Sequence, residues 1–517
     1  MTAGDGATPA KRRAGPRAGG RGGPISTTVP ATDLLAHLVA GDVSSSELLE
    51  LHLARIDTID PTLRSIVAID RDLARDQARA ADRIRREAAS SAHPVPALLG
   101  LPVTVKDAFA VAGLRTACGL AARVGGKPEV TDAPAVARLR AAGAIPFAKT
   151  NVPAYLGDLQ TSNDAFGTTV NPYDVRRSPG GSSGGAAAAV AAGLSALELG
   201  SDLSGSIRIP ASWCGLWGHC PSYGLVSKLG HLPWPLDGLL EPDSSVVGPL
   251  ARSADDLELA LGVLAGDVRP ATATPWLGPA LAPAPDRARR LADYTIATWT
   301  GDPSLPCDPE VASALDRTLG ALSDAGAHLV ELDTRPVSLP ACLELFACLV
   351  EGEIARGLGS AEIAEELQIA AGATGAPAPR RRKAVLRTQL HASWLAAAEQ
   401  REQVRAAWAR LFADVDAVIC PATPVVAIEH DHSPVDERTI AVGGRRRPYD
   451  ELSGWSSLAS VGRLPATVVP IGLAPRSLLP VGAQILGPYL GDYTTIAIGR
   501  LVGEVTGGYR PPPDPRP

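Results

Sequence analysis

The sequence predicts an α/β fold in which helices cover both faces of one largely parallel or mixed β-sheet. The chain has 517 residues, of which 45% are hydrophobic, so it can bury a large core. After Pro96, short β-branched runs alternate with Ala-rich helical stretches, and this alternation implies crossover connections between strands. Pro/Ala-rich breaks at residues 269–286, 372–382 and 432–449 separate no regions of different composition. We therefore interpret them as surface loops within a single large domain.

The N-terminal part of the chain predicts a tail followed by three helices. Residues 1–24 are rich in Gly, Ala and Arg and hold almost nothing apolar to bury, which predicts disorder. Thr32 or Asp33 is expected to cap a first helix that stops at Gly41. Ser44 and Glu47 have the spacing of a capping box ahead of a second helix. Residues 72–86 alternate in charge, which favours a third, solvent-exposed helix.

The following segment predicts the alternating elements of the sheet region. We expect strands at 101–105, 144–148 and 195–199, and helices at 133–142 and 185–192. The predicted domain spans residues 25–508, and residues 509–517 form a Pro-rich tail.

Composition excludes several classes of function. The formal net charge of −6 argues against nucleic-acid binding, which requires a basic face. No apolar run reaches the roughly 18 residues of a membrane span, and the basic N-terminus lacks the apolar region of a secretory signal. The seven cysteines are odd in number and form no CxxC pair, so they predict neither a disulfide framework nor a zinc site. We expect a cytoplasmic protein without a membrane partner.

The strongest local signal consists of two Gly/Ser-rich turns on either side of one helix-and-strand unit. Residues 179–185 are Pro-Gly-Gly-Ser-Ser-Gly-Gly, and residues 200–210 are Gly-Ser-Asp-Leu-Ser-Gly-Ser-Ile-Arg-Ile-Pro. Glycine lets backbone N–H groups converge, and such a nest beside a helix N-terminus binds negative charge. A phosphate cradle is disfavoured because neither phosphate-loop spacing is present. A nucleophile elbow would need a hydrophobic strand just before it, which residues 171–178 do not provide. An oxyanion hole with a nucleophile and a relay base is the third interpretation.

These two turns resemble the defining stretch of the amidase signature family, and the resemblance extends from about Asp33 to Leu501. The other segments that resemble family landmarks are 100–107 (Gly-Leu-Pro-Val-Thr-Val-Lys-Asp), 149–153 (Lys-Thr-Asn-Val-Pro), 167–172 (Gly-Thr-Thr-Val-Asn-Pro), 248–253 (Gly-Pro-Leu-Ala-Arg-Ser), 421–424 (Pro-Ala-Thr-Pro) and 480–487 (Pro-Val-Gly-Ala-Gln-Ile-Leu-Gly). Each landmark alone is weak, but in this order they are specific. The resemblance implies a single α/β domain with a central mixed sheet between helices.

The resemblance also implies a Ser-Ser-Lys triad. Ser206 would be the nucleophile, Ser182 the bridging serine after a cis Gly181–Ser182 bond, and Lys106 the base. A serine hydroxyl needs a base that accepts its proton during attack. Lysine can serve when burial disfavours its ammonium form, and Ser-Lys arrangements are variants of triad chemistry.

Further site residues follow from the same turns. The N–H groups of Leu203, Ser204, Gly205 and Ser206 would form the oxyanion hole. Family members usually have Gly where this chain has Ser204, so a positive φ there would strain the serine. Ser183 would support the triad by hydrogen bonding, and Asp202 and Arg208 are interpreted mainly as a buried pair that holds the nucleophile turn.

The remaining candidate residues receive structural interpretations. His219 and His231 are interpreted as core or loop histidines, because Lys106 already fills the role of base. The stretch Glu429-His430-Asp431-His432 is interpreted as a solvated loop rather than a metal site. Four cysteines among apolar neighbours are interpreted as small buried hydrophobes: Cys214, Cys220, Cys342 and Cys348. The expected chemistry needs no metal and no organic cofactor.

The expected function is hydrolysis of the C–N bond of a linear carboxamide through an acyl-Ser206 intermediate. Three alternatives stay open: an acyltransferase or amide synthase that uses the same acyl-enzyme, an amidotransferase-type subunit that supplies ammonia to a tRNA-bound substrate, and an inactive binding protein. The expected partner is a small-molecule amide, with a homodimer left open. Pocket walls are expected from the stretch between about Asp267 and Val426 and from Tyr155, Leu156 and Trp213.

Overall fold

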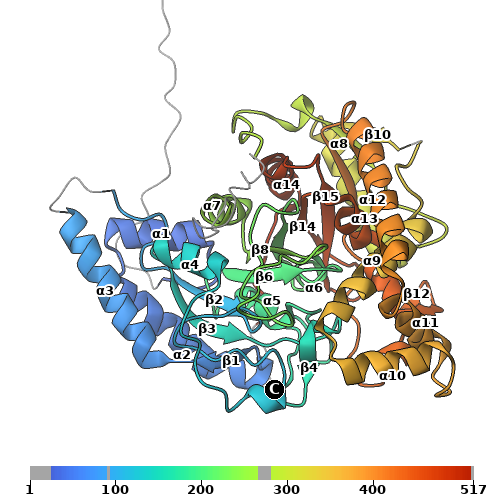
Figure 1. Ribbon diagram of the computed structural model, residues 1–517. Helices are drawn as coiled ribbons and strands as arrows, with labels where there is room; N and C mark the ends of the chain where they lie inside the picture. Colours follow the sequence, from blue (N-terminus) through green and yellow to red (C-terminus); the bar gives the residue numbers. More distant parts are fainter. Residues whose placement is uncertain (1–24, 90–93, 266–280, 333, 514–517) are drawn as a thin grey trace, which may run out of the picture.

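A single mixed β-sheet of 11 strands runs through the protein, which we describe from a computed structural model over residues 25–89, 94–265, 281–332 and 334–513 (Figure 1). In sheet order the strands are β1 (Ile66–Ile69), β3 (Ile145–Thr150), β2 (Pro102–Lys106), β6 (Glu198–Asp202), β8 (Val246–Ala251), β7 (Trp217–Cys220), β14 (Ala466–Leu473), β15 (Pro480–Leu486), β11 (Ala417–Pro421), β9 (Thr295–Thr298) and β10 (His328–Glu331). Strand β2 is parallel to both β3 and β6, whereas β8 is antiparallel to its two neighbours. The predicted α/β class with one mixed sheet is confirmed.

Helices cover both faces of this sheet. The largest apolar cluster packs one face against α1 (Ala31–Ala40), α4 (Pro134–Ala141), α7 (Ala254–Leu264), α8 (Pro309–Asp324) and α14 (Asp492–Thr506). The other face carries α2 (Ser45–Leu63), α3 (Arg71–Ala89), α5 (Gly184–Ala191), α6 (Arg208–Trp213) and α13 (Gly454–Gly462). Within the described residues, no helix is long and apolar enough to cross a bilayer.

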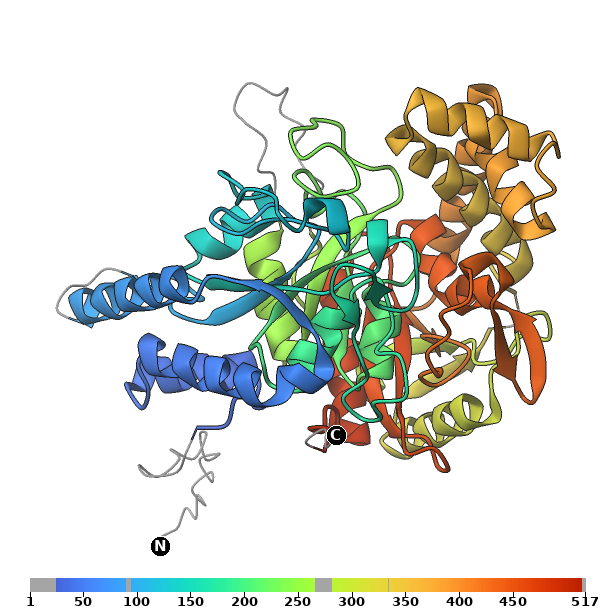
Figure 2. The same cartoon turned by 90° about the horizontal axis from the view of Figure 1, so that it is seen from below.

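Four further helices form a unit at one side of the molecule, where two of them share an apolar cluster with the sheet (Figure 2). They are α9 (Leu339–Ile354), α10 (Ser360–Ala370), α11 (Ala378–Arg387) and α12 (His391–Leu411). Arg387, the last residue of α11, links this helix to two others. Its guanidinium pairs with Glu351 of α9 at 2.7 Å and with Glu366 of α10 at 2.9 Å. The short elements are β4 (Ser162–Asn163), β5 (Gly167–Thr168), β12 (Thr439–Val442), β13 (Arg445–Pro448) and the 3-10 turns η1 (Ala121–Arg123), η2 (Ala154–Leu156), η3 (Leu291–Asp293), η4 (Ala355–Gly357), η5 (Val435–Glu437) and η6 (Tyr449–Ser453).

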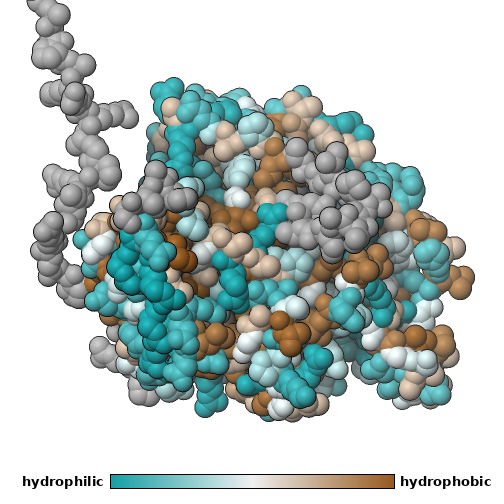
Figure 3. Space-filling model, turned by 60° about the vertical axis from the view of Figure 1, so that its left-hand side comes forward, coloured by the Kyte–Doolittle hydropathy of each residue, from teal (hydrophilic) through white to brown (hydrophobic). Residues whose placement is uncertain are grey.

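The N-terminal helices follow the predicted capping signals with one correction. Ser44 and Glu47 form the expected capping box of α2, and Gly41 ends α1 with φ 75°. The expected cap at Thr32 or Asp33 is wrong, because α1 already begins at Ala31 and Thr32 donates its N–H to Asp256 of α7. Helix α3 is amphipathic: Ala74, Ala78 and Ala81 are buried, and its charged side chains form a hydrophilic strip on this face of the molecule (Figure 3).

Three other expected segments differ in the structure. The strand expected at 195–199 is β6, which starts later because the Ser195 hydroxyl bonds the backbone of Leu197 and Thr104 in a turn. The loop expected at 372–382 contains the start of α11, and the loop expected at 432–449 contains the β12–β13 hairpin. Residues 1–24, most of 269–286 and residues 514–517 lie outside the described residues. The described part of the Pro-rich tail lies against the domain, where the Tyr509 hydroxyl donates to the Ala191 carbonyl at 2.9 Å.

Strands β2 and β6 set the position of the candidate site. Side chains alternate between the two faces of a strand, and Val103 and Val105 of β2 enter the largest apolar cluster. Lys106, the last residue of β2, therefore points to the opposite face, toward α5. Strand β6 pairs beside it and leads directly into the nucleophile turn.

Candidate active site

Lys106 lies fully buried among three oxygen atoms. Its Nζ is 2.7 Å from Ser182 Oγ, 3.1 Å from Ser201 Oγ and 3.2 Å from the Ser201 carbonyl oxygen. A buried ammonium is disfavoured, so burial, with a smaller contribution from the charge of Lys228, lowers the pKa of Lys106 to about 7. The carboxyl groups of Asp202 and Glu198 oppose this shift. Near neutral pH, a substantial fraction of Lys106 carries an unprotonated amine.

Ser182 is presented by a sharply folded backbone. The Gly181–Ser182 peptide bond is cis, as the family resemblance implies, and Gly180 has φ 90°. A Cβ at position 181 would approach the carbonyl carbon of Leu159 to 2.7 Å, so the bare backbone of Gly181 is what fits there. Ser183 donates its hydroxyl to the Ser201 carbonyl at 3.2 Å. The first Gly/Ser turn is thereby joined to β6.

Ser206 lies next to this segment in the second Gly/Ser turn. The N–H of Ser183 donates to the carbonyl of Ser206 at 3.2 Å, so the residue that follows Ser182 is bonded to Ser206. Both serines are nearly buried, with exposed fractions of 2% for Ser182 and 5% for Ser206. The structure therefore brings Lys106 into contact with Ser182 and places the backbone of Ser206 beside the first turn.

The second Gly/Ser turn, which contains Ser206, is held by a buried ion pair. Asp202 Oδ1 lies 2.8 Å from Arg208 Nη2, and the same carboxylate accepts the N–H groups of Gly205 and Ile207 at 2.7 and 2.9 Å. These interactions lower the pKa of Asp202 to about 2, against the effect of burial. The carboxylate thus closes the turn around Ser206.

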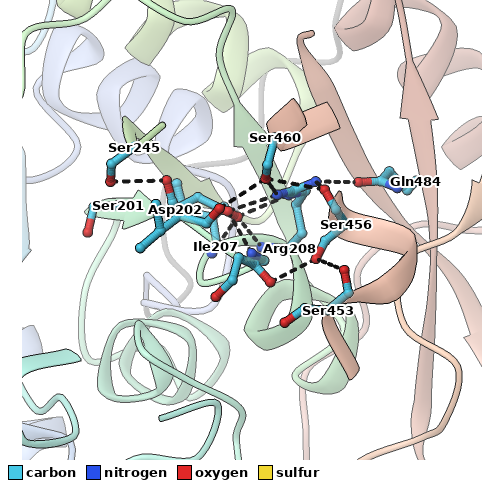
Figure 4. Close-up of polar contacts among 12 residues, drawn as sticks. Ser201, Asp202, Ile207, Arg208, Ser245, Ser453, Ser456, Ser460 and Gln484 are labelled. Carbon is cyan, nitrogen blue, oxygen red and sulfur yellow. Dashed lines mark hydrogen bonds and ion pairs between the residues drawn. The ribbon is translucent and has the colours of Figure 1, made fainter. Parts of the chain in front are cut away.

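Arg208 fastens this turn to the C-terminal part of the chain (Figure 4). Its guanidinium donates to the Ser456 carbonyl at 2.6 Å and to Gln484 Oε1 at 2.8 Å. The hydroxyls of Ser456 and Ser460 donate to the carbonyls of Ser204 and Leu203 at 2.7 and 3.0 Å. Helix α13 and strand β15 therefore fix the backbone on which the expected oxyanion donors lie.

Of the backbone N–H groups expected to form the oxyanion hole, some are bonded within the protein and others are not. Gly205 has φ 109°, and its N–H is engaged by Asp202. Ser204 is not among the non-glycine residues with positive φ, so the strain considered for this serine does not arise. Within the described residues, the N–H groups of Leu203, Ser204 and Ser206 have no protein acceptor. These three amides are available to a bound oxygen.

Sequence reasoning missed a polar group behind Lys106. His231 Nε2 lies 2.9 Å from Ser201 Oγ, and both residues are buried. Lys228 is also buried, with Nζ bonded to the Ser245 hydroxyl and 4.5 Å from the ring of Trp234. The available signal was the sequence Ser-Lys-Leu-Gly-His at 227–231, whose two basic residues lie in a segment otherwise rich in apolar and turn residues.

Other candidate residues lie apart from this group. His219 is a buried core histidine with its ring nitrogens 3.0 Å from Thr467 Oγ1 and 3.1 Å from Asp492 Oδ1. All seven cysteines are free, and Cys348 is half-buried rather than buried. Trp213 is fully buried with Nε1 bonded to the Val425 carbonyl, so its side chain is part of the core. Tyr155 is 61% exposed, whereas Leu156 packs beside Ala108 and Leu232 next to the end of β2.

Comparisons with known proteins find matches along nearly the whole chain. The family model described as Amidase matches residues 47–496. A glutamyl-tRNA(Gln) amidotransferase subunit from Roseiflexus castenholzii is 34% identical over 95% of this chain and 98% of its own length. The corresponding protein from Anaeromyxobacter is 35% identical over 93% of this chain and 96% of its own length.

Solved structures superpose over nearly the whole chain. One described as an amidase has a TM-score of 0.75 and 28% identity, and covers 93% of this chain and 100% of its own. Another comes from a vestigial protein complex related to the origins of an s-triazine catabolic enzyme, with a TM-score of 0.77, 27% identity and the same coverage. The ordered landmarks, the mixed sheet, and these matches have one explanation: the chain belongs to the amidase signature family.

Proposed function

We propose that this protein hydrolyses a carboxamide C–N bond through an acyl-Ser206 intermediate, with Ser182 and Lys106 as its proton relay. The observation that carries the proposal is the 2.7 Å contact between Lys106 Nζ and Ser182 Oγ in a buried site where the next residue, Ser183, is bonded to Ser206. Burial keeps part of the Lys106 population neutral, which a base requires.

Acylation moves one proton along the relay. Ser206 Oγ attacks the carbonyl carbon of the amide, its proton passes to Ser182, and the Ser182 proton passes to Lys106. The N–H groups of Ser204 and Ser206 donate to the negatively charged oxygen that develops. When the tetrahedral state collapses, the C–N bond breaks and the leaving nitrogen receives a proton back through Ser182. Ammonia or an amine departs, and Ser206 holds the acyl group as an ester.

Deacylation repeats this sequence with water as the nucleophile. Water loses a proton through Ser182 to Lys106, attacks the ester, and releases a carboxylic acid as Ser206 recovers its proton. No step uses Asp202 or Arg208 as a proton carrier, because their ion pair holds the turn. Asp202 and Arg208 are therefore positioning residues, and Ser183 supports the relay through its bond to Ser201.

The test is covalent labelling by a fluorophosphonate probe, read by intact mass and peptide mapping. Wild type is expected to gain one adduct on Ser206, Ser206→Ala none, and Lys106→Ala an adduct at a rate reduced by at least about 100-fold. Ser323→Ala, which removes an exposed serine on α8, is the matched control and should react like wild type. An adduct that survives Ser206→Ala would show that the nucleophile is another residue.

A second function is favoured by the amidotransferase subunits that match this chain over almost its full length. In such a role the formation of the acyl-enzyme from an amide would release ammonia for a tRNA-bound substrate, and the subunit would depend on other subunits. The isolated protein is tested with simple amides and with glutamine, while ammonia is measured. Ammonia release without any partner supports the amidase; a labelled Ser206 without turnover supports the amidotransferase role. Hydroxamate formed from added hydroxylamine would reveal acyl transfer.

A further inference from the structure

A neutral lysine amine must place its lone pair correctly to act as a base. The unprotonated Lys106 amine has two N–H groups and one lone pair. Three oxygen atoms surround it, and the Ser201 carbonyl can only accept a hydrogen bond. One N–H is therefore committed to that carbonyl. The other N–H and the lone pair are divided between the hydroxyls of Ser182 and Ser201.

The orientation of the Ser201 hydroxyl decides this division. If Ser201 donates its proton to Lys106, the lone pair is occupied and faces away from Ser182. If Ser201 donates elsewhere, its oxygen accepts the second N–H of Lys106 and the lone pair faces Ser182 Oγ. The alternative acceptor at hydrogen-bond distance is His231 Nε2, 2.9 Å from Ser201 Oγ.

The environment of His231 suits an acceptor at Nε2. The ring is fully buried, and burial lowers the pKa of His231 well below its ordinary value, so the ring is neutral. A neutral imidazole has one acceptor and one donor nitrogen. Nδ1 makes no hydrogen bond within the described chain, but the adjacent backbone of Leu232 favours a proton on the ring. An acceptor role for Nε2 toward Ser201 requires that proton on Nδ1.

The ring is held firmly in this place. The backbone of Leu232 donates to the Ala108 carbonyl at 2.8 Å, and Ala110 donates to the Gly230 carbonyl at 2.9 Å, so the segment of His231 is bonded to the residues that follow β2. The ring also packs edge-on against Phe109, with centroids 4.4 Å apart. His231 therefore keeps a fixed distance from Lys106 through the backbone that follows β2.

We propose that His231, acting through Ser201, is a positioning residue that turns the lone pair of Lys106 toward Ser182. This inference rests on the proposed function and adds the group that orients its base. It makes the histidine an acceptor in the ground state, with no proton transferred to or from it during turnover.

The first test compares substitutions that keep or remove the acceptor. His231→Phe retains the ring packing without an acceptor, and His231→Gln restores an acceptor near the position of Nε2. We expect His231→Phe to lower kcat and the rate of Ser206 labelling about 10- to 100-fold with little change in KM. His231→Gln should recover most of the rate.

Ser201→Ala should lower the rate similarly. The double variant Ser201→Ala/His231→Phe should lose no more activity than either single variant, because the two residues act as a unit. Equal defects in the Phe and Gln variants, or additive losses, would overturn the proposal.

The second test reads the ring directly and does not depend on turnover. In ¹⁵N-histidine-labelled protein, His231 is expected to show a protonated Nδ1 and an unprotonated Nε2, with its signal assigned by its loss in His231→Gln. A proton on Nε2 would overturn the proposal even in an active enzyme.

Absence of any Ser206 adduct in wild type would instead overturn the proposed function. His52→Phe is the matched control, because His52 is equally buried but bonds the Gly193 carbonyl away from the relay; it should leave kcat unchanged.

Discussion

At the scale of single residues, the charges around Lys106 determine the pH at which the relay can work. Burial is the largest influence on the pKa of Lys106, and Lys228 is the cation that adds to it. Cys118, Asp202 and Glu198 act in the opposite direction, and Glu198 is itself buried with its pKa raised to about 8. Because the base must be neutral, activity should rise with pH as Lys106 loses its proton.

The rate of Ser206 acylation is therefore expected to increase through a midpoint near pH 7 and to level off above it. Burial also lowers the pKa of Lys228 to about 7, so this lysine is only partly protonated near the midpoint. Lys228→Met removes that partial positive charge, so the pKa of Lys106 should rise and the midpoint should move up by less than about one pH unit. The measurement is the pH profile of kcat/KM with an uncharged amide. Lys383→Met, at a partly exposed lysine paired with Asp436 on the helical unit, should keep the wild-type midpoint. A downward shift in Lys228→Met would contradict the assignment of Lys106 as the base.

Residue-scale features are predictable from the sequence where their cause is local. The capping box of α2 and the stop at Gly41 depend on neighbours within a few positions, and both are found. The pairing of Ser201 with His231 is not predictable, because 30 residues separate them and they meet through the backbone bonds of the 108–110 segment. The catalytic assignments themselves come from resemblance to a family and stay predictions until Ser206 is labelled.

At the scale of elements, two segments that are predicted as loops from their composition contain regular secondary structure. Residues 432–449 predict a loop as one of the Pro/Ala-rich breaks, yet Gly443 and Gly444 have φ 56° and 77° and form the two-residue turn of the β12–β13 hairpin. Pro377 and Pro379 obscure the start of α11, although proline is compatible with the first turn of a helix. In both cases a glycine or proline that suggests an irregular loop is instead part of a hairpin turn or of the start of a helix.

Helix α5 shows how closely an element must fit to place Ser182. A Cβ on Gly185 would lie 2.4 Å from the Asn151 nitrogen and 2.5 Å from its carbonyl oxygen, both backbone atoms that cannot move independently. Gly185→Ala is expected to destabilise the fold by about 1–3 kcal/mol and to slow Ser206 labelling, because the helix must shift away from β3. Gly320→Ala is the matched control: this glycine of α8 is exposed with nothing near its Cβ position, and alanine there should stabilise by about 1 kcal/mol. Urea unfolding measures both; a neutral Gly185→Ala would contradict the close packing.

At the scale of the whole molecule, the nucleophile turn depends on residues far away in the chain. The guanidinium of Arg208 forms an ion pair with Asp202 in the N-terminal half of the chain. It donates hydrogen bonds to Ser456, Ser460 and Gln484 in the C-terminal part. Such long-range pairing cannot be predicted from either Gly/Ser turn, because nothing in residues 200–210 indicates which later segment covers them. The sequence predicted the ion pair but not its distant anchors.

Asp202→Asn is expected to destabilise the protein by about 3–5 kcal/mol, since it leaves the buried guanidinium of Arg208 without its counter-charge. Labelling of Ser206 should fall as well, because the N–H groups of Gly205 and Ile207 lose their charged acceptor. The matched control is Asp57→Asn, which breaks an exposed ion pair with Arg71 and should change the unfolding midpoint far less. Equal effects of the two substitutions in urea unfolding would contradict a structural role for the buried pair.

The anchoring of Arg208 also affects when during its synthesis the enzyme can become active. Lys106, Ser182 and Ser206 all leave the ribosome well before Ser456 and Gln484, which secure the turn that carries the nucleophile. A nascent chain therefore contains every reactive group of the proposed relay before it contains the C-terminal residues that hold the turn around Ser206 in place. Catalytic competence should arrive only with the last strands, so that unfinished chains attack no amides in the cell.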